Sequence, residues 1–221
     1  MKTLLVTTSD GSHTLFVPEI DEHYHSVNGA VQESLHIFIN AALKKCKKDK
    51  IHILEIGFGT GLNAFLSMLE AEKSNKQIVF TTIELYPVEY ENILSFNYAQ
   101  QVDSKRKEDF LLLHQVNWNE KVIINEHFTI EKILADFTSF EFKEKYDVIF
   151  FDAFSPEKQP EMWTENIFSQ MYRVSNKDCI LTTYCAKGIV RRAMQKAGYI
   201  VERIPGPKGK REILRSRKTE F

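Results

Sequence analysis

The chain has 221 residues, 43% of them hydrophobic and 27% charged, with a formal net charge of −1. This is the composition of an ordinary globular protein, and the length fits one domain with a sizeable core. No apolar run reaches the length of a membrane span, which excludes an integral membrane protein of the helical type.

Cysteine usage points to a reducing compartment. The three cysteines form no C-x-x-C pair and have no metal-ligand spacing, and we find no export signal. His23-x-His25 has no third ligand close in sequence, so we predict no metal site. We therefore expect a cytoplasmic protein.

Charge is distributed unevenly along the chain. The segment 187–221 contains eleven Lys and Arg against three Glu, a local charge of +8, which leaves −9 for the rest. A basic end on an acidic body indicates either a polyanionic partner or a solvated tail. Charge alone does not choose between these two interpretations.

The N-terminal part predicts a hairpin and a helix. Segments 3–8 and 13–18 have the pattern of short strands around the turn signal Ser9-Asp10-Gly11. Apolar residues at helical spacing predict a helix over 30–47. We expect residues 1–50 to form an extension packed on a core that spans 51–221.

The motif that dominates the core is I-H-I-L-E-I-G-F-G-T-G-L-N at 51–63. An apolar run that ends in alternating glycines is typical of a buried parallel strand that turns sharply into a helix. The pattern is Glu55-x-Gly57-x-Gly59-x-Gly61. Dinucleotide-binding proteins have the pattern G-x-G-x-x-G, in which the third glycine follows three residues after the second, and Leu62 occupies that position here. The pattern in this chain looks like the first motif of Rossmann-like methyltransferases that use S-adenosylmethionine (AdoMet). A purely structural turn and a nicotinamide or flavin site remain alternatives.

Two further strands are expected to end in carboxylates. After a helix over 62–73, segment 77–83 is a strand that ends at Glu84, placed to accept the ribose hydroxyls of an adenosine. The same argument holds for NAD and AdoMet. Segment 128–135 is a strand that ends at Asp136, which could hold an adenine amino group or cap a turn. A helix from Pro87 to about residue 98 and inserted helical structure over 99–127 lie between these strands.

The strongest apolar run, 146–151, predicts a strand that ends in Asp152-Ala-Phe-Ser-Pro156. Ligands of open parallel sheets bind beyond the carboxyl ends of the strands, so the glycine motif and these carboxylates should share one edge. Trp163, at the start of the next helix, is either part of the core or a stacking wall for a ligand. Segments 179–184, 199–204 and 211–215 are strands, with a helix over 187–197 and an antiparallel hairpin formed by the last two strands.

With these motifs in view, the chain resembles the methyltransferase half of the bacterial MnmC family of tRNA-modifying enzymes, especially its stand-alone MnmD type. The resemblance covers about residues 13–215. It is carried by the glycine motif, by E-L-Y-P at 84–87, by D-A-F-S-P-E-K-Q-P-E-M-W at 152–163, by T-Y at 183–184, by G-I-V-R-R at 188–192 and by P-G-P-K-G-K-R-E at 205–212. It implies a Rossmann-like class I AdoMet-dependent methyltransferase of the α/β class. The sheet would be seven-stranded and mostly parallel, in the order 3-2-1-4-5-7-6 with strand 7 antiparallel.

By this resemblance the protein transfers the methyl group of AdoMet to the aminomethyl nitrogen of 5-aminomethyl-(2-thio)uridine at the tRNA wobble position. MnmC also has an FAD-dependent oxidase half, for which this chain has no room, so we expect neither FAD nor an obligate protein partner. A methyltransferase that acts on a small metabolite amine or hydroxyl is the alternative, and a non-catalytic adenosine-binding module is a third interpretation.

The expected site residues fall into three groups. We expect Asp152 to be catalytic, accepting a hydrogen bond or a proton from the attacking amine, although it could instead bind the AdoMet amino group or cap its loop. Cofactor binding is expected from Glu55, Gly57, Phe58, Gly59, Gly61, Asn63, Glu84, Asp136 and Asp152. The tRNA anticodon would contact Phe154 or Trp163 through the base and, through its phosphates, Lys187, Arg191, Arg192, Lys208, Lys210 and Arg211.

Overall fold

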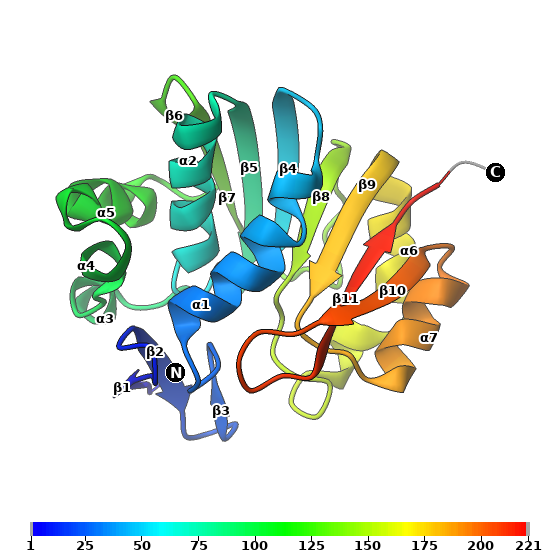
Figure 1. The fold of residues 1–221 in the computed structure, drawn as a ribbon, viewed down its shortest axis with the longest axis horizontal. Coiled ribbons are helices and arrows are strands. Elements are labelled where there is room, and N and C mark those ends of the chain that lie inside the picture. Colours follow the sequence, from blue (N-terminus) through cyan, green and yellow to red (C-terminus); the bar gives the residue numbers. More distant parts are fainter. Residues whose placement is uncertain (1, 220–221) are drawn as a thin grey trace.

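An eight-stranded sheet with helices on both faces forms the centre of the protein in the computed structural model, which describes residues 2–219 (Figure 1). The strand order is β10-β11-β9-β8-β4-β5-β7-β6. Strands β4, β5, β7, β8 and β9 are parallel, whereas β11 is antiparallel to both neighbours and β6 is antiparallel to β7. The bounds are β4 (Lys50–Ile56), β5 (Gln77–Glu84), β6 (Lys121–Asn125), β7 (Phe128–Leu134), β8 (Tyr146–Phe151), β9 (Ser175–Thr183), β10 (Ile200–Pro205) and β11 (Glu212–Arg217).

Alternation along the central strands divides the core into two layers. On β8, Val148 and Phe150 pack on one face of the sheet while Ile149 and Phe151 pack on the other. All four are fully buried, as expected of a parallel strand covered by helices on both faces. The first layer is covered by α1 (Ala30–Ser34), α2 (Leu62–Ser74), α4 (Tyr98–Val102) and α5 (Lys107–Gln115), and the second by α6 (Glu165–Val174) and α7 (Gly188–Lys196).

The structure corrects several expectations about these elements. The sheet has eight strands rather than seven, because the end of the segment predicted as helical insertion forms β6, an antiparallel edge strand. The helix expected over 30–47 is α1 followed by a π-helical turn, Leu35–Asn40, and a short 3-10 turn, Leu43–Lys45. The helix expected after Pro87 is replaced by the short helix α3 (Tyr90–Leu94), with α4 after it.

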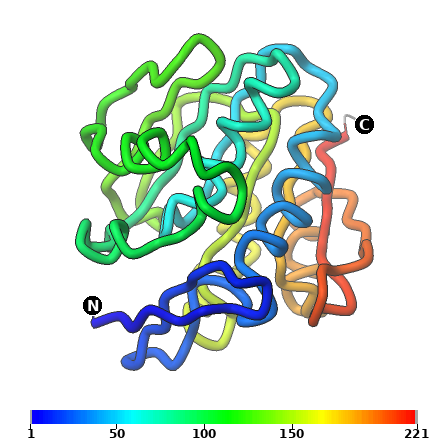
Figure 2. The backbone as a smooth tube through the Cα atoms, turned by 60° about the vertical axis from the view of Figure 1, so that its left-hand side comes forward, coloured from blue at the N-terminus to red at the C-terminus, as the bar shows by residue number. Residues whose placement is uncertain are grey.

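The N-terminal strands form a separate small sheet at the carboxyl ends of the main parallel strands (Figure 2). It consists of β1 (Leu4–Thr7), β2 (His13–Val17) and β3 (Glu22–His23), all antiparallel, and the predicted hairpin is confirmed. The segment after β3 contacts the glycine turn, since His25 Nε2 lies 2.7 Å from Thr60 Oγ1. The N-terminal residues therefore help to enclose the region where the parallel strands end.

No helix within residues 2–219 is both long enough and apolar enough to cross a membrane.

Candidate active site

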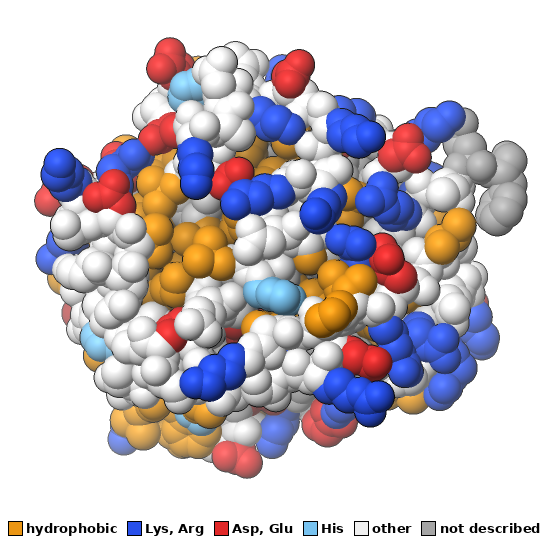
Figure 3. All heavy atoms as spheres, viewed as in Figure 1, with side chains coloured by type: hydrophobic (Ala, Val, Ile, Leu, Met, Phe, Trp, Pro, Cys, Tyr) orange, Lys and Arg blue, Asp and Glu red, His pale blue; other side chains and the backbone are white. Residues whose placement is uncertain are grey.

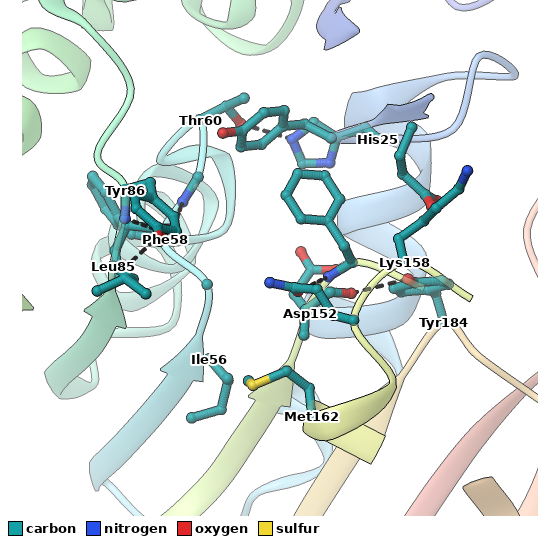
Figure 4. Close-up of a pocket in the computed structure, with 18 of the residues that line it drawn as sticks. His25, Ile56, Phe58, Thr60, Leu85, Tyr86, Asp152, Lys158, Met162 and Tyr184 are labelled. Atoms are coloured by element: carbon teal, nitrogen blue, oxygen red, sulfur yellow. Dashed lines mark hydrogen bonds between the residues drawn. The ribbon is translucent and has the colours of Figure 1, made fainter. Parts of the chain in front are cut away.

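A cavity of about 690 Å³ lies where β4, β5, β7 and β8 end, partly covered by the N-terminal segment 20–27 (Figure 4). This is the size range of pockets that hold small ligands and cofactors. Phe58, Leu85 and Tyr86 lie on one side, and Asp152 and Tyr184 lie on the other. Gly57 and Gly59 of the glycine motif line this cavity together with Glu84, Asp136 and Asp152, so these strand ends converge at one edge of the sheet as expected. Gly61 does not line it.

The glycine turn leaves bare backbone facing the cavity. Gly57 and Gly61 have φ values of 90° and 71°, which side chains rarely adopt. A Cβ atom on Gly57 would lie 3.0 Å from the backbone oxygen of Asp152, and one on Gly61 would lie 2.5 Å from His114 Nε2. The end of β8 and helix α5 approach the turn so closely that Gly57 and Gly61 have no room for a side chain.

Glu84 presents a carboxylate in a fixed orientation at the end of β5. Its Oε2 accepts a hydrogen bond from the Gly59 amide at 3.1 Å, and its Oε1 accepts from the amides of Leu85 and Tyr86 at 3.0 Å each. Burial raises the pKa of this carboxyl, and the amide hydrogen bonds oppose that rise. Oε1 already accepts two amide hydrogen bonds, whereas Oε2 accepts one and can still accept a hydrogen bond from a ligand hydroxyl.

Asp152 is connected to a buried chain of polar groups. Its Oδ2 accepts a hydrogen bond from Asn63 Nδ2 at 2.9 Å. Burial, and then the negative charge of Glu33, raise its pKa to about 7, while the Asn63 hydrogen bond and the Lys210 charge lower it. Near neutral pH this carboxyl therefore exists in both protonation states, as suits a general base.

Glu55 lies beneath the cavity rather than in its wall, which does not support direct contact with a ligand. Its Oε2 accepts from Thr82 Oγ1 at 2.8 Å, and burial raises its pKa well above the ordinary value. Its Oε1 and the Oδ1 of the adjacent Asn63 are both buried acceptors that lack a donor. A proton on Glu55 resolves both at once, because the acid can then donate to Asn63. We infer that neutral Glu55 orients the amide that in turn holds Asp152.

Glu33, Lys210 and Tyr184 form a second polar group on the cavity wall. Lys210 Nζ lies 3.4 Å from Glu33 Oε1 and 4.6 Å from the centre of the Tyr184 ring. Glu33 Oε2 accepts the Ser26 amide at 2.8 Å, and Tyr184 donates to the Ala153 carbonyl at 2.9 Å. Glu33 was not among the expected site residues; the segment Q-E-S at 32–34 also resembles the N-terminal part of the family, but helical spacing alone does not show that this glutamate faces a cavity.

Phe58 forms part of the cavity wall and is supported by the inserted segment expected near the ligand. Its ring centre lies 5.1 Å from that of His114 and 5.9 Å from that of Trp118. Lys132 Nζ lies 4.8 Å from the Trp118 ring and donates to the His114 carbonyl at 2.7 Å. These contacts fix the position of Phe58 without placing another charge in the cavity.

Two expected ligand contacts lie elsewhere or are already engaged. Trp163 belongs to the core, where its ring packs on Phe151 at 5.1 Å and its Nε1 donates to the Phe154 carbonyl at 2.8 Å. It does not line the cavity, so the stacking interpretation is wrong for this side chain, whereas Phe154 does line it. Asp136 lies at the rim, where its Oδ1 accepts from the Thr138 amide and hydroxyl at 2.8 and 2.7 Å. That is the turn-capping arrangement, and those bonds lower its pKa.

The basic residues of the C-terminal segment differ in their partners. Lys187 pairs with Glu157, and Lys210 pairs with Glu33 inside the cavity. Within residues 2–219, no carboxylate lies within ion-pair distance of the remaining expected phosphate contacts, Arg191, Arg192, Lys208 and Arg211. Figure 3 shows lysine and arginine side chains gathered on the face over α7 and the β10–β11 hairpin.

The Rossmann-like sheet, the glycine turn, the carboxylate after the second parallel strand and the cavity between them match the fold of class I AdoMet-dependent methyltransferases. Residues 93–219 match a family model described as S-adenosyl-L-methionine-dependent methyltransferase, and the chain belongs to that family. The match covers most of the chain, and the glycine turn lies outside it, so the motif and the family match are separate observations.

Relatives with named activities are also similar to the chain. It is 30% identical over 216 residues to the tRNA 5-methylaminomethyl-2-thiouridine biosynthesis bifunctional protein MnmC of Leptospira borgpetersenii serovar Hardjo-bovis, covering 91% of this chain and 33% of the relative. MnmC of Leptospira interrogans serovar copenhageni is 32% identical over 214 residues, covering 89% and 32%. The chain thus spans about a third of the length of these relatives.

Solved structures support the same fold. The crystal structure of MNMC2 from Aquifex aeolicus superposes with a TM-score of 0.82 at 25% identity, covering 99% of this chain and 71% of that chain. Spermidine synthase from Thermotoga maritima superposes with a TM-score of 0.58 at 14% identity, covering 99% and 72%, which shows a shared fold alone.

Proposed function

We propose that this protein methylates the aminomethyl nitrogen of 5-aminomethyl-(2-thio)uridine at the wobble position of tRNA, with AdoMet as methyl donor. The observation that carries the proposal is the similarity to MnmC and MNMC2 over nearly the whole chain. The cavity supports it, because a carboxyl whose pKa lies near 7 faces the place where an amine would enter.

The residues of the cavity fit AdoMet. The bare glycine turn would lie against the methionine portion, the Glu84 carboxylate would accept the ribose hydroxyls, and the apolar side chains of Ile83, Leu85 and Phe137 would flank the adenine. When bound, AdoMet supplies an electrophilic methyl group attached to a sulfonium. FAD has no role in this proposal.

The chemical task of the protein is to present a neutral amine. An alkylamine has a pKa of about 10, like lysine, and is mostly protonated at neutral pH. The ionised form of Asp152 would accept the ammonium proton, which leaves the nitrogen lone pair free to attack the methyl carbon. The new N–C bond forms as the S–C bond breaks, and the electron pair of that bond stays on sulfur.

Charges around the amine decide whether that proton transfer is feasible. A pKa difference of about three units opposes transfer from an alkylammonium to Asp152, which corresponds to about 4 kcal/mol. The Lys210 ammonium in the cavity wall favours loss of the proton from a nearby ammonium, because like charges repel. The Asn63 hydrogen bond holds the carboxylate in place to receive it.

Methyl transfer from radiolabelled AdoMet to undermodified tRNA tests the proposal. We expect label in tRNA that carries 5-aminomethyl-2-thiouridine, recovered as methylaminomethyl-2-thiouridine after nuclease digestion, and none in tRNA with unmodified uridine at that position. Asp152→Ala should retain AdoMet binding and lose transfer. Transfer to small amines but not to tRNA would support a metabolite methyltransferase instead.

A further inference from the structure

A second, open cleft of about 310 Å³ adjoins the main cavity and shares Tyr184 and Lys210 with it. These two side chains contact each other, so they form the partition between the two hollows. Pro156, Cys185 and Ala186 supply an apolar wall on the far side of the partition. The two hollows therefore adjoin, and a ligand made of two linked units could occupy both.

The cleft carries a cation that is not neutralised by the protein. Its own glutamate, Glu212, lies 3.4 Å from Arg203. Lys187 is paired with Glu157, and Lys210 with Glu33. Arg211 is exposed and, as far as residues 2–219 extend, has no carboxylate within ion-pair distance. An arginine fork free of internal partners is suited to an anion, above all a phosphate.

The surroundings of Arg211 add to this preference. Helix α7 begins at Gly188, directly after Lys187 of the cleft, and has neither a capping side chain nor an acidic residue in its first turn. The positive end of the helix thus increases the potential for an anion here. The anion site is assigned from the cleft and its cations, and the end of helix α7 only adds to the positive potential there.

We propose that this cleft binds the nucleotide adjacent to the target uridine, with its phosphate on Arg211 and its sugar or base against Pro156 and Ala186. The proposal rests on the proposed function and extends it from one base to a dinucleotide step. The Tyr184–Lys210 partition would then separate the target base from its neighbour. This agrees with the usual recognition of single-stranded RNA, in which bases are splayed apart and phosphates are held individually.

A neutral phosphate analogue tests the contact directly. The substrate is an anticodon stem–loop that carries 5-aminomethyluridine, with a methylphosphonate in place of the phosphate on either the 5′ or the 3′ side of that nucleotide. We expect one of the two neutral linkages to lower kcat/KM of the wild-type protein roughly tenfold. In Arg211→Ala the same linkage should change kcat/KM by less than about twofold, because the partner charge is already absent.

Lys196→Ala is the matched control, because it removes a positive charge from the same C-terminal region at an exposed lysine that pairs with Glu165 outside the cleft. It should retain the full tenfold response to the neutral linkage. Calorimetry of AdoMet binding verifies that each variant is folded.

The proposal is overturned if neither neutral linkage affects the wild type, or if Arg211→Ala shows an undiminished response. A stem–loop that the wild type does not methylate at all would instead refute the proposed function.

Discussion

Replacing Asp152 with asparagine should make the folded protein more stable at alkaline pH while abolishing methyl transfer. The carboxyl has an ordinary pKa of 3.8 and a pKa of about 7 in the folded protein, raised first by burial and then by Glu33. A group whose folded pKa is raised favours folding below its unfolded pKa, and that contribution is lost as pH rises through the folded pKa. For Asp152 the loss falls between about pH 4 and pH 7.

The magnitude follows from the two pKa values. Each pKa unit corresponds to about 1.36 kcal/mol, so the full loss is about 4 kcal/mol. Between pH 5 and pH 8 the wild type should lose roughly 2.5 kcal/mol of this contribution, and the asparagine variant should lose none. The free energy of unfolding of the variant relative to wild type should therefore rise by that amount between these two pH values.

Urea unfolding of both proteins at pH 5 and pH 8, followed by tryptophan fluorescence, measures the difference. The difference in free energy of unfolding between variant and wild type is calculated at each pH. In this difference, the contributions of all groups that titrate alike in both proteins cancel. Asp136→Asn is the matched control, because that exposed carboxyl has a lowered pKa and its replacement should give no gain at pH 8. If wild type and Asp152→Asn differ by the same free energy at both pH values, the raised pKa is refuted and, with it, the argument for a base of this strength.

Three further predictions follow from the contacts in the cavity. Glu84→Gln should weaken AdoMet binding about tenfold or more in calorimetry, since an amide accepts fewer hydroxyl hydrogen bonds than a carboxylate, and an unchanged constant would exclude the ribose role. Glu55→Gln should retain transfer because its amide still donates to Asn63, whereas Glu55→Ala should lower kcat roughly tenfold or more; equal effects of the two would exclude a neutral donor. Lys210→Gln should move the pH profile of kcat/KM to higher pH, because that charge lowers the pKa of Asp152, and a shift to lower pH would contradict it.

The sequence was sufficient to predict the parallel core and the edge at which the site lies. Apolar runs that end in glycine or a carboxylate mark β4, β5, β7 and β8, and parallel strands bring their carboxyl ends to one side. The edge strand β6 was missed because its apolar run, Val122-Ile123-Ile124, is only three residues long and does not distinguish a strand from a helical segment. Ile123 of this strand is 76% exposed, so its side chain gives a misleading hydrophobic signal.

The site was predicted less completely, because it depends on the directions of side chains and on contacts between residues far apart in the sequence. Glu55 precedes the glycine turn, but the pleat of β4 turns it beneath the cavity toward Thr82. Trp163 is close in sequence to Asp152, yet its ring fills the core beside Phe151. Glu33 enters the site from α1, which no local motif connects to the end of β8. Side-chain direction and long-range packing decide these cases, and neither is visible in residue spacing.

In the proposed reaction, Glu84 and Asp152 would enclose one adenosine-linked sulfonium with its reactive carbon directed toward an entering base. A crystal structure with S-adenosylhomocysteine measures this most directly. We expect ribose hydroxyls hydrogen-bonded to Glu84 and the thioether sulfur on the Asp152 side of the cavity. A nucleoside bound away from Glu84, or a sulfur atom turned away from Asp152, would contradict this arrangement.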